Sequence, residues 1–196
     1  MTDESKSVPK FVWDELEEFK AEKRFLDGYP PDTRTFYAPQ DDIKGLLTSL
    51  LQSAQNSLVL NMYGYDDEQL DAIIRQKLKE ERVYVQMSLD STQAGGKAER
   101  AILQGWDNEG FGNSIAIGTS SEHAISHLKV LIVDGVYTVT GSTNWSFSGE
   151  TKQDNQLTLS RNAVLAAEAR AVLDRNHDFM LKQMAEKRAK DGESTG

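Results

Sequence analysis

The chain has 196 residues, of which 38% are hydrophobic, and its 31 acidic and 22 basic residues give a net charge of −9. This length fits one globular domain with an added element, and the absence of cysteine excludes disulfides, thiolate catalysis and cysteine-ligated zinc. The acidic balance excludes binding of nucleic acid or an anionic membrane by bulk electrostatics, so an anionic substrate requires a local basic pocket.

The first part of the chain, residues 1–32, predicts a flexible segment followed by an amphipathic helix. Residues 1–8 are polar, Ser7 and Pro9 are typical of a helix start, and apolar residues then recur at helical spacing as far as Gly28. We expect the apolar stripe to pack on its own domain, with a second copy of the chain as the alternative partner. The start of the chain resembles no secretory signal and no apolar run is long enough to span a membrane. We therefore expect a cytoplasmic protein without stable membrane insertion.

Residues 33–188 predict a single α/β domain, because short runs of β type alternate with helical runs. Expected strands cover residues 33–38, 57–65, 82–90, 113–118, 127–133, 136–141 and 154–160, and expected helices cover 41–54, 67–81, 97–106 and 163–188. The fold class is a mixed β-sheet sandwiched between helices. The runs 127–133 and 136–141 are apolar at nearly every position, which places them near the middle of the sheet. Residues 189–196 are expected to form a disordered tail.

A predicted hairpin around Asp134-Gly135 carries the chemistry. The pattern HxKxxxxDxxxxxxGSxN begins at His127, and Asp-Gly is a strong signal for a two-residue turn. Such a turn places His127 opposite Ser142. Because side chains alternate along a strand, His127, Lys129, Ser142 and Asn144 are expected to project from one face.

This set of side chains suits phosphoryl chemistry without a metal ion or another cofactor. Lys129 supplies positive charge, Asn144 donates hydrogen bonds to phosphate oxygens, and His127 attacks phosphorus or transfers a proton. A metal-dependent phosphodiesterase needs several converging carboxylates or histidines, whereas only His123 and His127 lie near this hairpin and Lys129 repels a cation. The pattern therefore predicts a phosphodiesterase site.

The segment from Ser126 to Gln156 resembles the HKD motif of the phospholipase D superfamily, particularly its short single-motif bacterial nucleases. Weaker similarity extends from about Thr33 to Met184. The resemblance implies two motifs per active site, so a chain with one copy forms a homodimer whose active site lies at the two-fold interface. It also implies that one His127 attacks phosphorus to form a phosphohistidine, while His127 of the other subunit protonates the leaving oxygen and then activates water.

The same resemblance gives each remaining motif residue a role: Lys129 and Asn144 bind phosphate, Ser142 supports the site, and Asp134 and Gly141 are structural. Family members also place a carboxylate after GSxN that orients the nucleophilic histidine. Asp154 and Glu150 are the two candidates, and we favour Asp154 because it directly precedes a predicted strand.

Two further substrate contacts are predicted. Trp145 follows the motif and can stack a base or a lipid headgroup, with core packing as the alternative. Lys97 follows two glycines in a loop near the site and can reach substrate. The sequence thus predicts an endonuclease acting on DNA or RNA. Hydrolysis of a phospholipid or small phosphodiester, and non-catalytic binding of phosphate or nucleic acid, are the alternatives.

Overall fold

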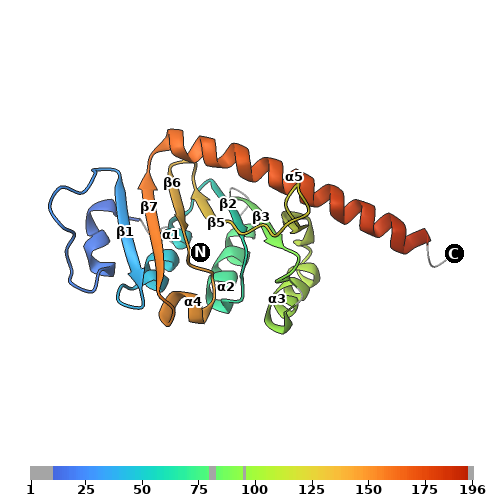
Figure 1. Cartoon of the computed structure of the whole chain (residues 1–196), viewed down its shortest axis with the longest axis horizontal. Helices are drawn as coiled ribbons and strands as arrows, with labels where there is room; N and C mark the ends of the chain where they lie inside the picture. The colour runs from blue at the N-terminus through green and yellow to red at the C-terminus, as the bar shows by residue number, and fades with distance from the viewer. Residues whose placement is uncertain (1–10, 80–82, 95, 194–196) are drawn as a thin grey trace, which may run out of the picture.

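The computed structural model describes residues 11–79, 83–94 and 96–193, except for the side chains of residues 97, 98 and 191–193 (Figure 1). The described strands form one seven-stranded sheet in the order β1-β7-β6-β5-β2-β3-β4. Strands β2, β3 and β4 run parallel to one another, and the other neighbours are antiparallel. Their bounds are β1 Thr33–Ala38, β2 Ser57–Met62, β3 Tyr84–Asp90, β4 Ile115–Gly118, β5 Lys129–Val133, β6 Tyr137–Gly141 and β7 Asn155–Arg161.

Helices cover both faces of this sheet. Alternate residues of a strand point to opposite faces: Val59 of β2 packs against α5, whereas Leu58 and Leu60 join the larger core that includes α1, α2 and α3. The predicted α/β class and the central position of β5 and β6 are confirmed. The helices are η1 Trp13–Phe19 and η2 Gly112–Ser114, both 3-10 helices, and α1 Ile43–Ser53, α2 Glu68–Leu78, α3 Lys97–Asn108, α4 Phe147–Thr151 and α5 Ala163–Glu193.

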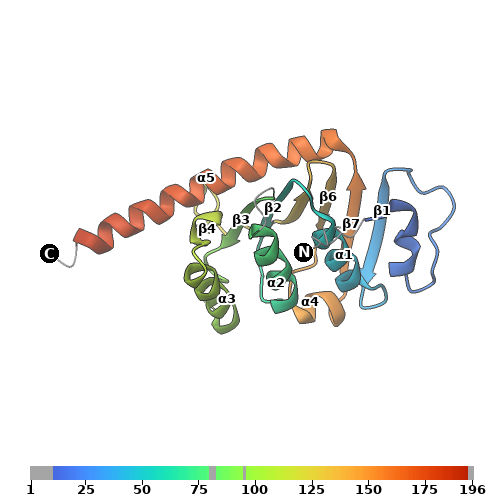
Figure 2. The ribbon, with the colours of Figure 1, turned by 180° about the vertical axis from the view of Figure 1, so that it is seen from behind.

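Helix α5 runs along one face of the sheet and extends beyond its edge, as Figures 1 and 2 show. It continues to Glu193, past the expected end at residue 188, and residues 194–196 lie outside the described part of the chain. Among the described residues, no helix combines the length and apolar character needed to cross a membrane.

The N-terminal helix is shorter than predicted. Residues 1–10, which include the expected flexible segment, lie outside the described residues, and the helix that follows ends at Phe19. Its extension is prevented because the Ala21 N–H donates to the Asp41 carboxylate (2.9 Å) instead of to a helical carbonyl. Trp13 and Leu16 are buried in the core, so this segment packs on its own domain.

The hairpin between β5 and β6 departs from the predicted register by one residue. Val133 lies opposite Tyr137 instead of Val136, so the turn contains Asp134, Gly135 and Val136. The Val136 N–H still donates to the Val133 carbonyl (3.1 Å), as in a two-residue turn, but the ladder begins one residue later. A shift of one residue moves side chains to the opposite face of a strand, and this changes the predicted grouping of the motif.

Candidate active site

Tyr63 lies between the histidine and the lysine of the motif. Its ring is edge-on to the His127 imidazole, with centroids 4.6 Å apart, and the Lys129 Nζ lies 4.9 Å from the centre of the same ring. Gln93 donates a hydrogen bond to the Tyr63 hydroxyl (3.0 Å). Because Met62 pairs with Lys129 across β2 and β5, the strand register brings Tyr63 to this position.

Lys129 is buried at the start of β5, while His127 just before it is exposed. The Lys129 Nζ donates to the backbone carbonyl of His127 (3.0 Å), which ties the cation to the base of the imidazole. Burial lowers the pKa of Lys129. Within the described ranges, no carboxylate forms an ion pair with this ammonium group. The arrangement offers an accessible imidazole next to a positive charge that an anion can neutralise.

Asn144 is joined to the loop between β2 and α2. Its Oδ1 accepts a hydrogen bond from the Gly64 N–H (3.3 Å), which leaves its NH₂ group available as a donor. A side chain at Gly64 would come within 3.1 Å of the Asn144 Cγ, so the close approach depends on glycine. The backbone of Trp145 donates to Gly64 (3.1 Å) and accepts from Asp66 (2.9 Å). These contacts hold Asn144 close to Tyr63.

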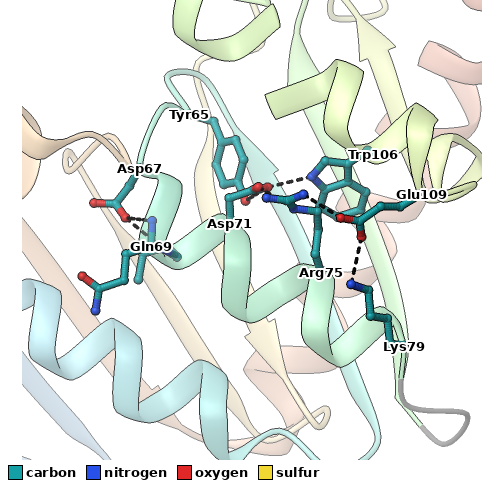
Figure 3. A network of polar contacts seen from close by, with 9 residues as sticks. Tyr65, Asp67, Gln69, Asp71, Arg75, Lys79, Trp106 and Glu109 are labelled. Carbon is teal, nitrogen blue, oxygen red and sulfur yellow. Dashed lines mark hydrogen bonds and ion pairs between the residues drawn. The ribbon is translucent and has the colours of Figure 1, made fainter. Parts of the chain in front are cut away.

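The β2–α2 loop is itself held by a buried polar network (Figure 3). Asp71 of α2 accepts hydrogen bonds from the Tyr65 hydroxyl (3.1 Å) and the Trp106 indole (2.7 Å), and its carboxylate pairs with Arg75 (2.8 Å). Burial raises the pKa of Asp71. Arg75 also pairs with Glu109 (2.9 Å), so the network joins α2 to the end of α3. Tyr65 is thereby fixed two residues beyond Tyr63.

Trp145 is a core residue, so the predicted contact between its side chain and substrate is wrong. The side chain is 1% exposed and its ring lies 6.2 Å from that of Tyr65. The hydrophobic contact with Tyr65 and the two-sided backbone bonding turn the indole away from solvent. Lys97 is the first residue of α3, and its side chain lies outside the described part of the structure.

Ser142 and Lys129 do not project from the same face of the β5–β6 hairpin, contrary to the prediction. Continuing the observed register places Lys129 opposite Gly141, and Lys129 shares a small space with Thr143. The Ser142 hydroxyl instead donates to the Asn155 side chain (2.9 Å) and faces a cavity that Asp154 also lines. Within one chain, His127 and Lys129 contact the Tyr63 ring, and Asn144 bonds to Gly64, the next residue along the chain. Ser142 instead lines the same cavity as Asp154.

Gly141 and Asp134 make backbone contacts. At Gly141, φ is +156° and a Cβ would lie 2.0 Å from the Gln156 carbonyl oxygen, so β6 can approach β7 only without a side chain. The Asp134 carboxylate accepts from the backbone N–H groups of Gln55, Asn56 and Ser57 at 2.7 to 3.2 Å. It thus fastens the hairpin turn to the start of β2.

The two candidate orienting carboxylates differ in environment. Glu150 in α4 is 2% exposed. Burial, together with the negative charge of Asp67, raises its pKa to about 8, although Lys44 opposes this. Asp154 is exposed beside β7. The raised pKa disfavours the ionised form of Glu150, which is the form that accepts a hydrogen bond from an imidazole N–H. Asp154 therefore stays the preferred prediction, although it lies beside Ser142 and not beside His127 of the same chain. Among the described residues, no group of three or more His, Asp or Glu side chains is arranged to hold a metal ion.

Residues 47–176 match the family model described as the PLD-like domain of cardiolipin synthase, where PLD denotes phospholipase D. The chain belongs to the phospholipase D superfamily. This confirms the resemblance of the chain to that superfamily. No curated protein matches the chain at a significant level.

Solved structures of this superfamily share the fold. Nuc from Salmonella typhimurium, a phospholipase D family member, is 26% identical, with a TM-score of 0.63 over 75% of this chain and 94% of Nuc. NucT from Helicobacter pylori is 16% identical, with a TM-score of 0.57 over 74% and 94% of the two chains. Phosphatidylserine synthase from Haemophilus influenzae is 12% identical, with a TM-score of 0.57 over 74% and 39%. The last two similarities show the fold alone.

Neither Tyr63 nor Gln93 was predicted to have a role in the site. Tyr63 directly follows the buried strand β2. Side chains from the ends of neighbouring strands gather at such positions, so its place after a strand could have indicated a role in the site. Gln93 lies in the turn after β3, and nothing in the sequence indicates that it reaches Tyr63.

Proposed function

We propose that this protein is a metal-independent phosphodiesterase that cleaves DNA or RNA internally. The observation that carries the proposal is the exposed His127 imidazole next to the buried Lys129 ammonium, both in contact with Tyr63. An imidazole is a nucleophile at neutral pH, and a fixed cation stabilises the charge that develops on a phosphate in the transition state.

In the proposed reaction, a nitrogen of His127 attacks phosphorus and the bond from phosphorus to the leaving oxygen breaks. The leaving oxygen takes a proton from His127 of a second subunit in a homodimer. That second imidazole then removes a proton from water, whose oxygen attacks phosphorus and breaks the P–N bond. Lys129 and the Asn144 NH₂ group bind the non-bridging oxygens throughout, and Asp154 orients an imidazole.

The choice of a nucleic acid rests on the resemblance of the single motif copy to the short bacterial nucleases of the superfamily. The chain is acidic as a whole, with a net charge of −9. Substrate binding therefore depends on local groups such as Lys129 and not on a general basic surface.

The test is cleavage of plasmid and single-stranded DNA or RNA in the presence of EDTA. We expect cleavage by the wild type and a loss of about a thousand-fold or more for His127→Asn. His123→Asn is the matched control: His123 is exposed in a loop at a φ of +55°, which asparagine tolerates. Mass spectrometry of protein quenched during turnover should find His127 bonded to the phosphate of a cleaved fragment, since only one of the two ester bonds has broken.

Three results would count against the proposal. Cleavage that EDTA removes would exclude the metal-independent mechanism. Headgroup release from phosphatidylcholine vesicles without cleavage of nucleic acid would favour a phospholipid hydrolase. Binding of oligonucleotides with neither turnover nor a phosphorylated histidine would indicate a binding module.

A further inference from the structure

A cavity of about 760 Å³ lies next to the catalytic motif. Its wall on the motif side contains Ser142 and residues 154–156. The opposite wall is built by residues 20–29 and the end of β1, which lie before residue 47, where the match to the family model begins. The cavity therefore combines motif residues with a part of the chain that the family match does not cover.

Tyr37 provides an aromatic surface in this cavity. It is half exposed, at 50%, on the edge strand β1, and it lies directly opposite Gln156 of β7 in the strand register. Residues paired in this way project from the same face with their Cβ atoms close together. An aromatic ring and an amide group thus lie side by side, and Phe25 and Tyr29 also line the cavity.

The two basic side chains in the lining, Lys20 and Arg24, each lie beside an acidic side chain, so the cavity does not attract a phosphate. Lys20 pairs with Asp41, and Arg24 lies 3.5 Å from Glu22. Asp154 adds a further negative charge to the lining. The lining is therefore unsuited to an anionic group and suited to a neutral one.

We propose that this cavity binds the base of a nucleotide adjacent to the scissile phosphate, an inference that rests on the proposed nuclease function. A base is neutral and planar, so it can stack on Tyr37 while the Gln40 amide and the Gln156 Oε1 bond to its edge; the Gln156 NH₂ group already donates to Thr158. The cavity volume lies in the range of small-molecule sites. A lipid acyl chain would exclude water and leave the Gln40 amide and the Gln156 Oε1 without partners, which costs free energy.

The test uses an oligothymidylate in which one central linkage is a phosphodiester and the others are methylphosphonates, so that a single bond can be cut. In the wild type, an abasic residue at one position beside that bond should lower kcat/KM by a factor of about 5 to 100, as expected for the loss of stacking. Tyr37→Ala should lower kcat/KM on the intact oligonucleotide by the same factor and have no further effect on the abasic one. Tyr37→Phe should retain the wild-type preference.

The matched control is Tyr84→Ala, because Tyr84 is an equally exposed strand tyrosine, at 51%, on β3 and does not line the cavity. The inference is overturned if Tyr37→Ala affects intact and abasic substrates equally or not at all. It is also overturned if Tyr37→Ala changes only the hydrolysis of phosphatidylcholine vesicles. If the wild type cuts no oligonucleotide, the proposed function fails separately. Base-dependent binding, measured by fluorescence anisotropy and lost in Tyr37→Ala, would still support the cavity.

Discussion

Tyr63 contacts both the proposed nucleophile and the cation that lies beside it. The centre of its ring lies 4.6 Å from that of the His127 imidazole and 4.9 Å from the Lys129 Nζ. A cation near a ring face and an edge-on aromatic pair each contribute modestly to stability. The larger consequence is geometric, since the ring fixes the separation of two groups that act on one phosphate.

We predict that Tyr63→Ala lowers kcat by about ten- to a hundredfold, because a misplacement of reacting groups on the order of 1 Å has effects of this size. Tyr63→Phe keeps the ring and loses only the hydrogen bond from Gln93, so its kcat should stay within a few-fold of the wild type. Steady-state kinetics at saturating substrate measures the difference. A purely structural role would instead lower the melting temperature of both variants and leave kcat per folded molecule unchanged.

Replacement of the two candidate carboxylates should separate their roles. We expect Asp154→Asn to lower kcat by about a hundredfold or more, as found when the carboxylate that orients a catalytic histidine is lost. Glu150→Gln should have near wild-type kcat because Glu150 is buried away from the imidazole. Single-turnover rates on the same substrate compare them. A larger loss of kcat in Glu150→Gln than in Asp154→Asn would contradict the assignment of the orienting role to Asp154.

Glu150 should also make stability depend on pH. Its pKa is raised from 4.5 to about 8 in the folded protein. As pH rises through this window, the unfolded chain releases a proton that the folded chain retains, so the free energy of unfolding falls. Glu150→Gln cannot release a proton, and its unfolding free energy should fall less between pH 5 and 8. Urea unfolding across this range measures the slope, with exposed Glu168→Gln as a control that keeps the wild-type slope.

At the scale of elements, the β5–β6 hairpin is attached to the start of β2 by one side chain. Asp134 receives hydrogen bonds from three consecutive backbone N–H groups at the start of this strand. The aspartate of the motif therefore belongs to the scaffold.

We predict that Asp134→Ala lowers the free energy of unfolding by about 1–3 kcal/mol, the net contribution of hydrogen bonds to a charged acceptor. Its kcat, measured on protein that is folded at low temperature, should remain within a few-fold of the wild type. Asp134→Asn keeps one acceptor oxygen and should lose less stability. A catalytic defect in a stable Asp134→Asn variant would contradict the structural role.

Apart from the short helices η2 and α4, the order of the strands and helices in residues 33–193 followed from the sequence, because the alternation of apolar periods reports burial directly. The register of the hairpin did not, since Asp134-Gly135 permits both a two-residue turn and one that includes Val136. The one-residue difference in register turns the Ser142 side chain away from Lys129 and toward the cavity that Asp154 lines. The N-terminal helix was overestimated because its end depends on Asp41, a contact distant in sequence. Tyr63 was missed for the same reason, since its partner His127 is likewise distant in sequence.

At the scale of the whole molecule, the proposed mechanism requires a second copy. The described chain brings together one set of His127, Lys129 and Asn144. If the active site forms between two subunits, a dimer with one altered histidine is inactive.

We predict that the protein is a homodimer by light scattering. When wild-type and His127→Asn chains are unfolded together and refolded in varied ratios, the activity should fall with the square of the wild-type fraction. Subunits that act independently would give a linear decrease, which would exclude a shared site. Refolded wild type alone provides the reference activity.

The contacts that hold Asn144 beside the β2–α2 loop are mostly backbone hydrogen bonds, with Trp145 bonded on both sides to the chain between Gly64 and Asp67. Any residue except proline can supply such an N–H group, so these contacts do not depend on the side chains at positions 66 and 67. Gly64 differs because of its close contact with Asn144.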